Sequence, residues 1–504
     1  MGFQSLSESD ISESGSNTEL TSGRDSLWPP IRYLASLYRR FCDATERYLP
    51  LIVVCSFIGG IFLAKSVPLL AEYVNSGVEG LVDQYGTFAP LVIFLILAPS
   101  LSRMLSARGG KGGKFVSYAI VWLSFRRLLS LGWAVIFTTV VFGFPFWAGH
   151  GANVSSSAKQ SLDTLLDMAV HSNYFYAMYL SVIAALLTRH SRLLKVTLSK
   201  TLNGVEILGQ YMVPFIPLFM VAIGCYVYQL PENVNSQIGA EGALTVPLQP
   251  LRVLGMNFES STAVGMVKVY VIISLLIGVA CILWHLMLLL WTKYRINSST
   301  VYSFSIKEYF LNYWVKVYPL LWATSSEALA TPLNLFLVKR HYPWIRTNVR
   351  RFVIGIGSYL SINGTMICVI VLAGAVASIL GVELTGAQLL LSAPLVFLIG
   401  FGVPGIPGEL LLFGGPVVML FNLPPEVAQV FLTLYLGLQI GLPDSFRTGN
   451  NSTDDCVQAI LLNDVYERKY QSDQDLIEEL LQNEHFVHTF AALLEDRKED
   501  TVHQ

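Results

Sequence analysis

Long apolar segments, separated by short polar ones, fill most of the chain up to residue 297. They lie near 48–71, 87–106, 128–147, 170–188, 206–230 and 264–292. A helix that crosses a membrane needs about 20 mostly apolar residues, whereas barrel strands alternate with period two over about ten residues. Only helices and closed barrels satisfy their backbone hydrogen bonds in lipid. The pattern therefore predicts an all-α polytopic membrane protein.

Basic residues gather after the second, fourth and sixth apolar segments, whereas the intervening loops hold few of them. The basic set is Arg103, Arg108, Lys111, Lys114, Arg126, Arg127, Arg189, Arg192, Lys195, Lys200, Lys293 and Arg295. Under the positive-inside rule, this asymmetry places these loops and both termini in the cytoplasm. The apolar stretch 115–125 is interpreted as an interfacial helix that leads into the third span. We expect an integral protein of the plasma membrane.

Composition narrows the class of function. The chain is 53% hydrophobic and 13% charged, against about 25% charged residues in soluble domains. Its net charge of -2 offers no basic surface for nucleic acid. No GxSxG or HExxH motif is present, so nothing indicates an enzyme. The polar ends, 1–47 and the acidic segment 464–504, are predicted to be cytoplasmic tails, the first of them disordered.

After residue 297 the apolar segments become short and carry ionisable residues. Three of them are interrupted by Gly, Pro, Ser or Thr, at 323–332, 361–365 and 402–409. The last contains three glycines and two prolines and cannot continue a regular helix. Discontinuous helices in transporters expose backbone groups near the middle of the membrane, where their dipoles hold substrates and ions. These segments are therefore where a binding site is expected.

The last apolar segment contains a polar stripe. At about 100° per residue, Asp444, Arg447, Asn451 and Asp455 fall within an arc of roughly 80° on one helix face. A helix that has simply left the membrane would also carry such a face. The flanking apolar runs at 426–442 and 457–462 argue against that reading and favour a site.

Four segments in the same order resemble the dicarboxylate/amino acid:cation symporter family, which includes the glutamate transporters. Residues 324–332 are similar to the tip of the family's first re-entrant hairpin, and 402–409 to the tip of the second. Residues 357–365 are similar to its Gly-x-x-x-Asn-Met-Asp-Gly-Thr span. Residues 444–455 match its Asp-x-x-Arg-Thr-x-x-Asn-Val-x-Gly-Asp stripe.

The resemblance implies eight transmembrane helices and two re-entrant helical hairpins, arranged as inverted repeats in a homotrimer that works by an elevator motion. Helices 1–6 would then occupy 48–296. Hairpin 1, helix 7, hairpin 2 and helix 8 would occupy 297–463 and form the substrate and ion core.

The resemblance also implies roles for single residues. Arg447 would pair with a side-chain carboxylate of the substrate, for which a planar fork is suited, and Asp444 would take its ammonium group. The implied substrate-binding residues are Ser325, Ser326, Thr365, Gly405, Asp444, Arg447, Thr448 and Asn451. The implied cation ligands, which suit a hard ion such as sodium, are Ser361, Asn363, Asn451 and Asp455. No other cofactor is expected.

Departures from the family pattern leave the substrate and the coupling ion open. Ser361 and Asn363 stand where the family has Asn and Asp, which predicts a weaker deep cation site and fewer coupled sodium ions. Glu327 interrupts the serine run as in dicarboxylate relatives, whereas Asp444 marks the amino acid branch. Asp454 replaces a glycine, and either it shares a proton with Asp455 or it faces a polar neighbour.

His285 stands alone in an apolar run and is interpreted as a packed or interfacial histidine, not as part of a proton relay. The chain is thus expected to be a secondary active symporter of an acidic amino acid or dicarboxylate, coupled to sodium, to protons or to both. The alternative is a substrate-gated anion channel or sensor on the same fold.

Overall fold

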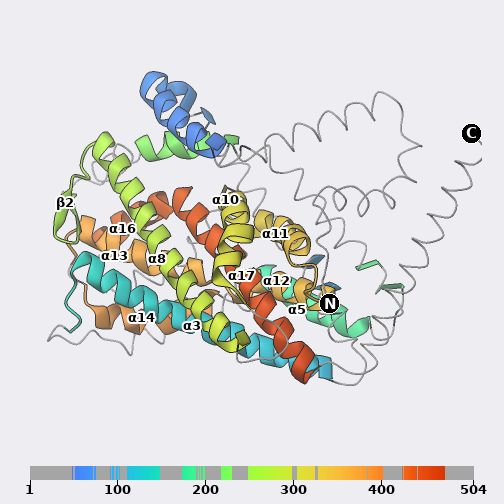
Figure 1. The fold of residues 1–504 in the computed structure, drawn as a ribbon. Coiled ribbons are helices and arrows are strands. Elements are labelled where there is room, and N and C mark those ends of the chain that lie inside the picture. The colour runs from blue at the N-terminus through green and yellow to red at the C-terminus, as the bar shows by residue number, and fades with distance from the viewer. Residues whose placement is uncertain are drawn as a thin grey trace, which may run out of the picture. The chain divides into compact units, whose positions relative to one another are not determined.

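The computed structural model describes ten ranges of the chain, with single residues between some of them (Figure 1). The ranges are 51–71, 111–147, 173–188, 220–229, 248–297, 304–323, 327–382, 384–400, 425–439 and 441–470. All of them belong to the larger of two compact units, Leu49–Gln504. The predicted tail 1–47 and the second hairpin tip 402–409 lie outside the described residues, as do residues 471–504.

Long apolar helices dominate the first half of the described chain. They are α3 (Lys111–Phe142), α5 (Asn173–Leu187), α8 (Ala263–Asn297) and a shorter helix over Leu51–Ser66. Two stretches, Gly113–Phe142 and Ala263–Ile296, are long and apolar enough to cross a membrane. The helical, apolar character predicted from the sequence is therefore present in these elements.

The α3 helix differs from the prediction. It is continuous from Lys111 to Phe142, so the stretch 115–125 is helical and runs without a break into the segment predicted as the third span. Arg126 and Arg127 lie inside this helix and are buried, so counting them as loop charges was wrong. The Arg126 guanidinium lies 4.9 Å from the Trp284 ring centroid, and Arg127 Nη2 donates to the backbone carbonyl of Phe397. Such partners allow a buried arginine inside an apolar helix.

A short β-hairpin is the one described element that an all-α prediction misses. Strands β1 (Leu251–Val253) and β2 (Met256–Phe258) pair antiparallel. Leu254 and Gly255 between them have positive φ, at 48° and 81°, as a two-residue type I′ turn requires. The Leu254 amide donates to the carbonyl of Val141 at 2.8 Å, which ties the hairpin to the end of α3.

The second half of the described chain consists of shorter helices. They are α9 (Ile306–Glu308), the π-helix η3 (Tyr309–Trp314), α10 (Val315–Ala323), α11 (Glu327–His341), α12 (Thr347–Leu360), α13 (Asn363–Ile379), α14 (Gly386–Ile399), α16 (Pro425–Gln439) and α17 (Leu442–Lys469). The break expected within 361–365 lies between α12 and α13, at Ser361 and Ile362. Around the first predicted hairpin tip, α10 ends at Ala323 and α11 begins at Glu327.

The polar helix α17 is packed on several sides by other helices. It contacts α8, α10, α12 and α13, and α13 in turn packs on α3 (Figure 1). Asp444, Arg447, Asn451 and Asp455 are all buried, so the polar stripe of this helix faces the protein interior. The helix also extends past residue 464, where the C-terminal tail was predicted to begin.

Two glycines allow this close packing. A Cβ atom on Gly364 of α13 would lie 2.7 Å from the backbone oxygen of Arg447. A Cβ atom on Gly357 of α12 would lie 2.2 Å from Oδ1 of Asp455. At Gly364 a larger residue would meet the backbone of α17 and push the helices apart, whereas at Gly357 it would displace the carboxylate of Asp455. The polar stripe of α17 therefore lies directly against the broken helix pair α12 and α13.

Candidate functional site

Arg447 is the centre of a buried polar cluster. Its Nε donates to Asp444 Oδ1 at 2.7 Å, one helical turn earlier in α17. Its Nη1 donates to Thr365 Oγ1 of α13 at 3.1 Å and lies 3.6 Å from Glu327 Oε1 of α11. We call Asp444, Arg447, Asn451, Thr365 and Glu327 the Arg447 cluster. It joins three helices that lie far apart in the sequence.

Asn451 connects the cluster to the start of α13. Its Oδ1 accepts a hydrogen bond from the backbone amide of Gly364 at 2.5 Å. Its Nδ2 donates to Thr365 Oγ1 at 3.1 Å and also to Glu327 Oε1. The first contact fixes which way the amide faces, because an amide oxygen accepts and an amide nitrogen donates.

Glu327 was not among the predicted site residues, although the sequence marked it as a departure. It begins α11 and is buried. Its Oε1 also accepts from Thr365 Oγ1, at 3.2 Å. The available signal was an acidic residue within the predicted tip of the first hairpin, in a segment expected to lie inside the membrane. The contacts with Asn451 and Arg447 join positions more than a hundred residues away and leave no pattern in the sequence.

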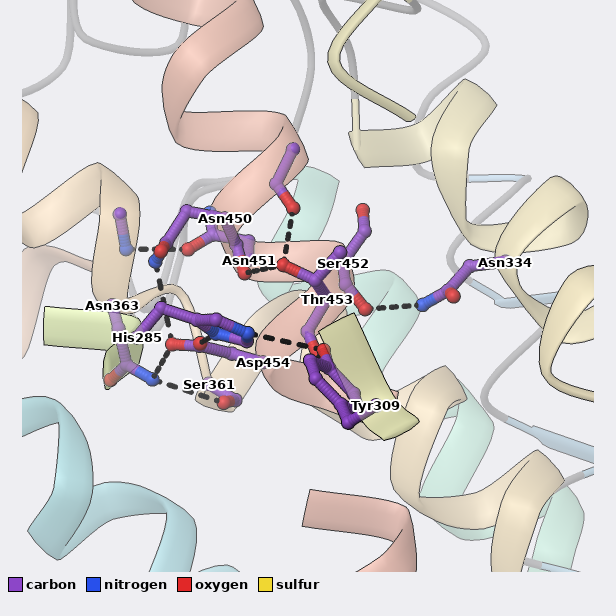
Figure 2. A network of polar contacts seen from close by, with 12 residues as sticks. His285, Tyr309, Asn334, Ser361, Asn363, Asn450, Asn451, Ser452, Thr453 and Asp454 are labelled. Atoms are coloured by element: carbon purple, nitrogen blue, oxygen red, sulfur yellow. Dashed lines mark hydrogen bonds and ion pairs between the residues drawn. The ribbon is translucent and has the colours of Figure 1, made fainter. Parts of the chain in front are cut away.

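A second cluster surrounds Asp454 on α17. Oδ1 of Asp454 lies 2.5 Å from Nδ1 of His285 in α8, and Oδ2 accepts from Asn363 Nδ2 at 3.0 Å and from Asn450 Nδ2 at 3.4 Å. Nε2 of the histidine lies 3.1 Å from the hydroxyl of Tyr309 (Figure 2). We call His285, Tyr309, Asn363, Asn450 and Asp454 the Asp454 cluster. All five side chains are buried.

These contacts bear on two sequence readings. His285 is packed in the interior, as expected, but it does not stand alone because Asp454 and Tyr309 flank its ring (Figure 2). Asp454 faces three polar neighbours, which is one of the two alternatives left open by the sequence.

Three of the four predicted cation ligands are linked by hydrogen bonds. Asn363 Nδ2 donates to Ser361 Oγ at 3.4 Å, and the Ser361 side chain is also hydrogen-bonded to the carboxylate of Asp455, which packs against Gly357. The fourth, Asn451, belongs to the Arg447 cluster. Among the described residues, Asp455 Oδ1 and Asn363 Oδ1 are buried oxygens without a hydrogen-bond partner. Oxygens of this kind are suitable ligands for a hard cation such as sodium.

The remaining predicted substrate residues contribute less to this geometry. Ser325, Ser326 and Gly405 lie outside the described residues. Thr448 is buried in α17, and its Oγ1 has no hydrogen-bond partner within the described part of the chain. The predicted substrate-binding residues that the structure brings together are therefore Thr365, Asp444, Arg447 and Asn451.

The chain matches one known family. The model of the sodium:dicarboxylate symporter family covers residues 49–465, which include both clusters. A search of curated proteins finds no match.

Proposed function

The chain belongs to the sodium:dicarboxylate symporter family, and on this basis we propose that it moves an acidic amino acid or a dicarboxylate across the membrane together with cations. Membership makes it an integral membrane protein of a transporter family, not of an enzyme family.

The observation that carries the proposal is the burial of Arg447 among hydrogen-bonding groups of three helices. An arginine at membrane depth marks a substrate or ion pathway and needs an anionic partner. Its planar fork suits a carboxylate, and beside it the Thr365 hydroxyl and the Asn451 amide both donate to the carboxylate of Glu327. The N-terminal end of α13, at Asn363 and Gly364, adds the positive end of a helix dipole. These features together favour an anionic substrate.

Asp444 supports an amino acid as the substrate. Its Oδ1 atom lies 2.7 Å from Nε of Arg447. An amino acid whose side-chain carboxylate binds the guanidinium would therefore have its ammonium group close to Asp444. A dicarboxylate without an ammonium group would gain nothing from this residue. We therefore place acidic amino acids first and dicarboxylates second.

Sodium is the coupling ion that the family suggests, and we assign Asp455 and Asn363 as its ligands. Both carry a buried oxygen without a hydrogen-bond partner among the described residues. In an elevator mechanism the helices around α17 would move as one body, and their close packing through Gly364 and Gly357 supports that assignment. A homotrimer follows from the same family resemblance.

Uptake by the purified protein in proteoliposomes tests this function. Glutamate, aspartate and succinate are offered with an inward sodium gradient, an inward proton gradient or neither. We expect accumulation of acidic substrates that depends on sodium. Substrate-gated current without accumulation would point to a channel instead, and the absence of both would refute the proposal.

A further inference from the structure

The carboxylate of Glu327 already occupies the donors that a substrate carboxylate would use. Its Oε1 accepts from Thr365 Oγ1 and Asn451 Nδ2 and lies 3.6 Å from Arg447 Nη1. Two hydrogen-bond donors and one guanidinium nitrogen, from two other helices, thus converge on one oxygen of a third helix. Hydrogen bonds that involve a charged partner are about twice as strong as neutral ones. The side chains of Arg447, Thr365 and Asn451 therefore form a receptor for a carboxylate.

The orientation of Asn451 shows that the receptor is arranged for an acceptor. Its Oδ1 is engaged by the Gly364 amide at 2.5 Å, so its Nδ2 must face the other way, toward Glu327. The close approach of α13 at Gly364 makes this contact possible, because a Cβ there would lie 3.0 Å from Asn451 Oδ1. The amide is therefore held with its donor facing Glu327.

We propose that Glu327 is a tethered occupant of this receptor, formed by Arg447, Thr365 and Asn451, and that a substrate carboxylate binds by displacing it. The identity of the substrate rests on the function proposed above, whereas the receptor and its occupant do not. Glu327 is then a residue that sets specificity, because a ligand must bring a carboxylate to compete for the same donors.

Physical arguments indicate that a substrate carboxylate replaces the carboxylate of Glu327 and does not bind beside it. Two carboxylates at the same donors would repel one another inside a buried cluster, where the cost is large. Exchange of one carboxylate for another keeps the charge around Arg447 constant. The Oε2 atom of Glu327 has no hydrogen-bond partner among the described residues, so displacement breaks the contacts of a single oxygen.

The exchange has consequences for selectivity. A neutral amide analogue of the substrate cannot fully replace the Glu327 carboxylate beside Arg447, because it brings no negative charge to the guanidinium and Asp444 alone would balance it. Glu327 also competes with every ligand of the receptor, and it lowers their apparent affinity by the fraction of time for which Glu327 itself occupies the receptor. Removing it should therefore tighten binding of acidic ligands.

Chemical rescue of Glu327→Ala tests the receptor without any assumption about the substrate. The full chain is reconstituted in nanodiscs, and its melting temperature is measured against rising sodium acetate. Sodium chloride at matched ionic strength and acetamide, the neutral analogue of acetate, are the controls. We expect acetate alone to raise the melting temperature of Glu327→Ala, and the effect to vanish in wild type and in Glu327→Ala/Asn451→Ala. Equal responses to acetate and acetamide would overturn the proposal.

Binding of acidic ligands to Glu327→Gln provides the second measurement, and it decides the matter if the alanine variant does not fold. The glutamine keeps the shape and removes the competing charge. We expect the dissociation constants of glutamate and succinate to fall by about tenfold or more. Unchanged or weaker binding of both ligands would overturn the proposal. Weaker binding of glutamate alone would also overturn it, because it would show that Glu327 binds the ammonium group of the substrate. Acetate rescue in a protein that transports no acidic substrate would refute the proposed function alone.

Discussion

Nδ1 of His285 lies 2.5 Å from Oδ1 of Asp454, although 169 residues separate them in the sequence. Both side chains are buried, and the other ring nitrogen lies 3.1 Å from the Tyr309 hydroxyl. A buried carboxylate is costly unless it is paired and hydrogen-bonded. The imidazole of α8 therefore serves as the partner of the aspartate that stands where the family pattern has a glycine.

Loss of this pairing should destabilise the protein. We expect His285→Leu to lower the free energy of unfolding by about 1–3 kcal/mol, because Asp454 is left with an unmet hydrogen bond in the interior. Unfolding in detergent, followed by circular dichroism, measures the loss. The double variant His285→Leu/Asp454→Ala removes both partners and should cost less than the sum of the single changes. Strict additivity would contradict the pairing.

The close approach of α13 to α17 should not tolerate a side chain at Gly364. We expect Gly364→Ala to lower both the melting temperature and the rate of uptake, because its Cβ would lie 2.7 Å from the Arg447 backbone oxygen. Gly132→Ala in α3 is the matched control, because a Cβ there meets nothing within 4 Å and alanine favours a helix. Similar behaviour of the two variants would show that the packing is looser than described.

Asp455 should control the dependence on sodium. We expect Asp455→Asn to raise the sodium concentration for half-maximal uptake by about tenfold or more, because it removes the charge from a proposed oxygen ligand. Asp464→Asn is the control, since this acid lies on the same helix and pairs with Arg468. An unchanged sodium dependence in Asp455→Asn would rule out the assignment.

The number of coupled sodium ions remains a separate prediction. The sequence replaces an Asn and an Asp of the family span by Ser361 and Asn363, which favours fewer ions than in relatives that keep both. The structure adds a carboxylate beside this position, since Asp454 accepts from Asn363 at 3.0 Å, but it also pairs that carboxylate with His285. The reversal potential of uptake, with sodium and pH gradients varied separately, measures the stoichiometry. A stoichiometry equal to that of those relatives would contradict the prediction.

Local geometry is what the sequence could predict. The contact between Asp444 and Arg447 follows from a spacing of three residues on a helix, and the break between α12 and α13 follows from polar residues inside an apolar run. Both depend on neighbours along the chain. The type I′ turn at Leu254 and Gly255 was missed because leucine is a poor signal for positive φ.

Contacts between distant segments could not be predicted in the same way. His285 and Asp454, or Glu327 and Asn451, meet only because α8, α11 and α17 pack together. Arg126 and Arg127 were assigned to a loop because charge normally ends a membrane helix, and the sequence does not show that Trp284 and the Phe397 carbonyl lie beside them. The role of a charged residue inside an apolar helix can therefore be assigned only when the structure shows which groups contact it.

The most direct test of the account is the selectivity of uptake by Arg447→Cys in proteoliposomes. Acidic and neutral amino acids are compared for this variant, for wild type and for Arg346→Cys, which removes a part-buried arginine paired with Glu467. We predict that Arg447→Cys reduces uptake of acidic substrates by at least about tenfold and reduces neutral uptake far less, because only the acidic side chain needs the guanidinium. Equal uptake of acidic substrates by wild type and Arg447→Cys would contradict the account.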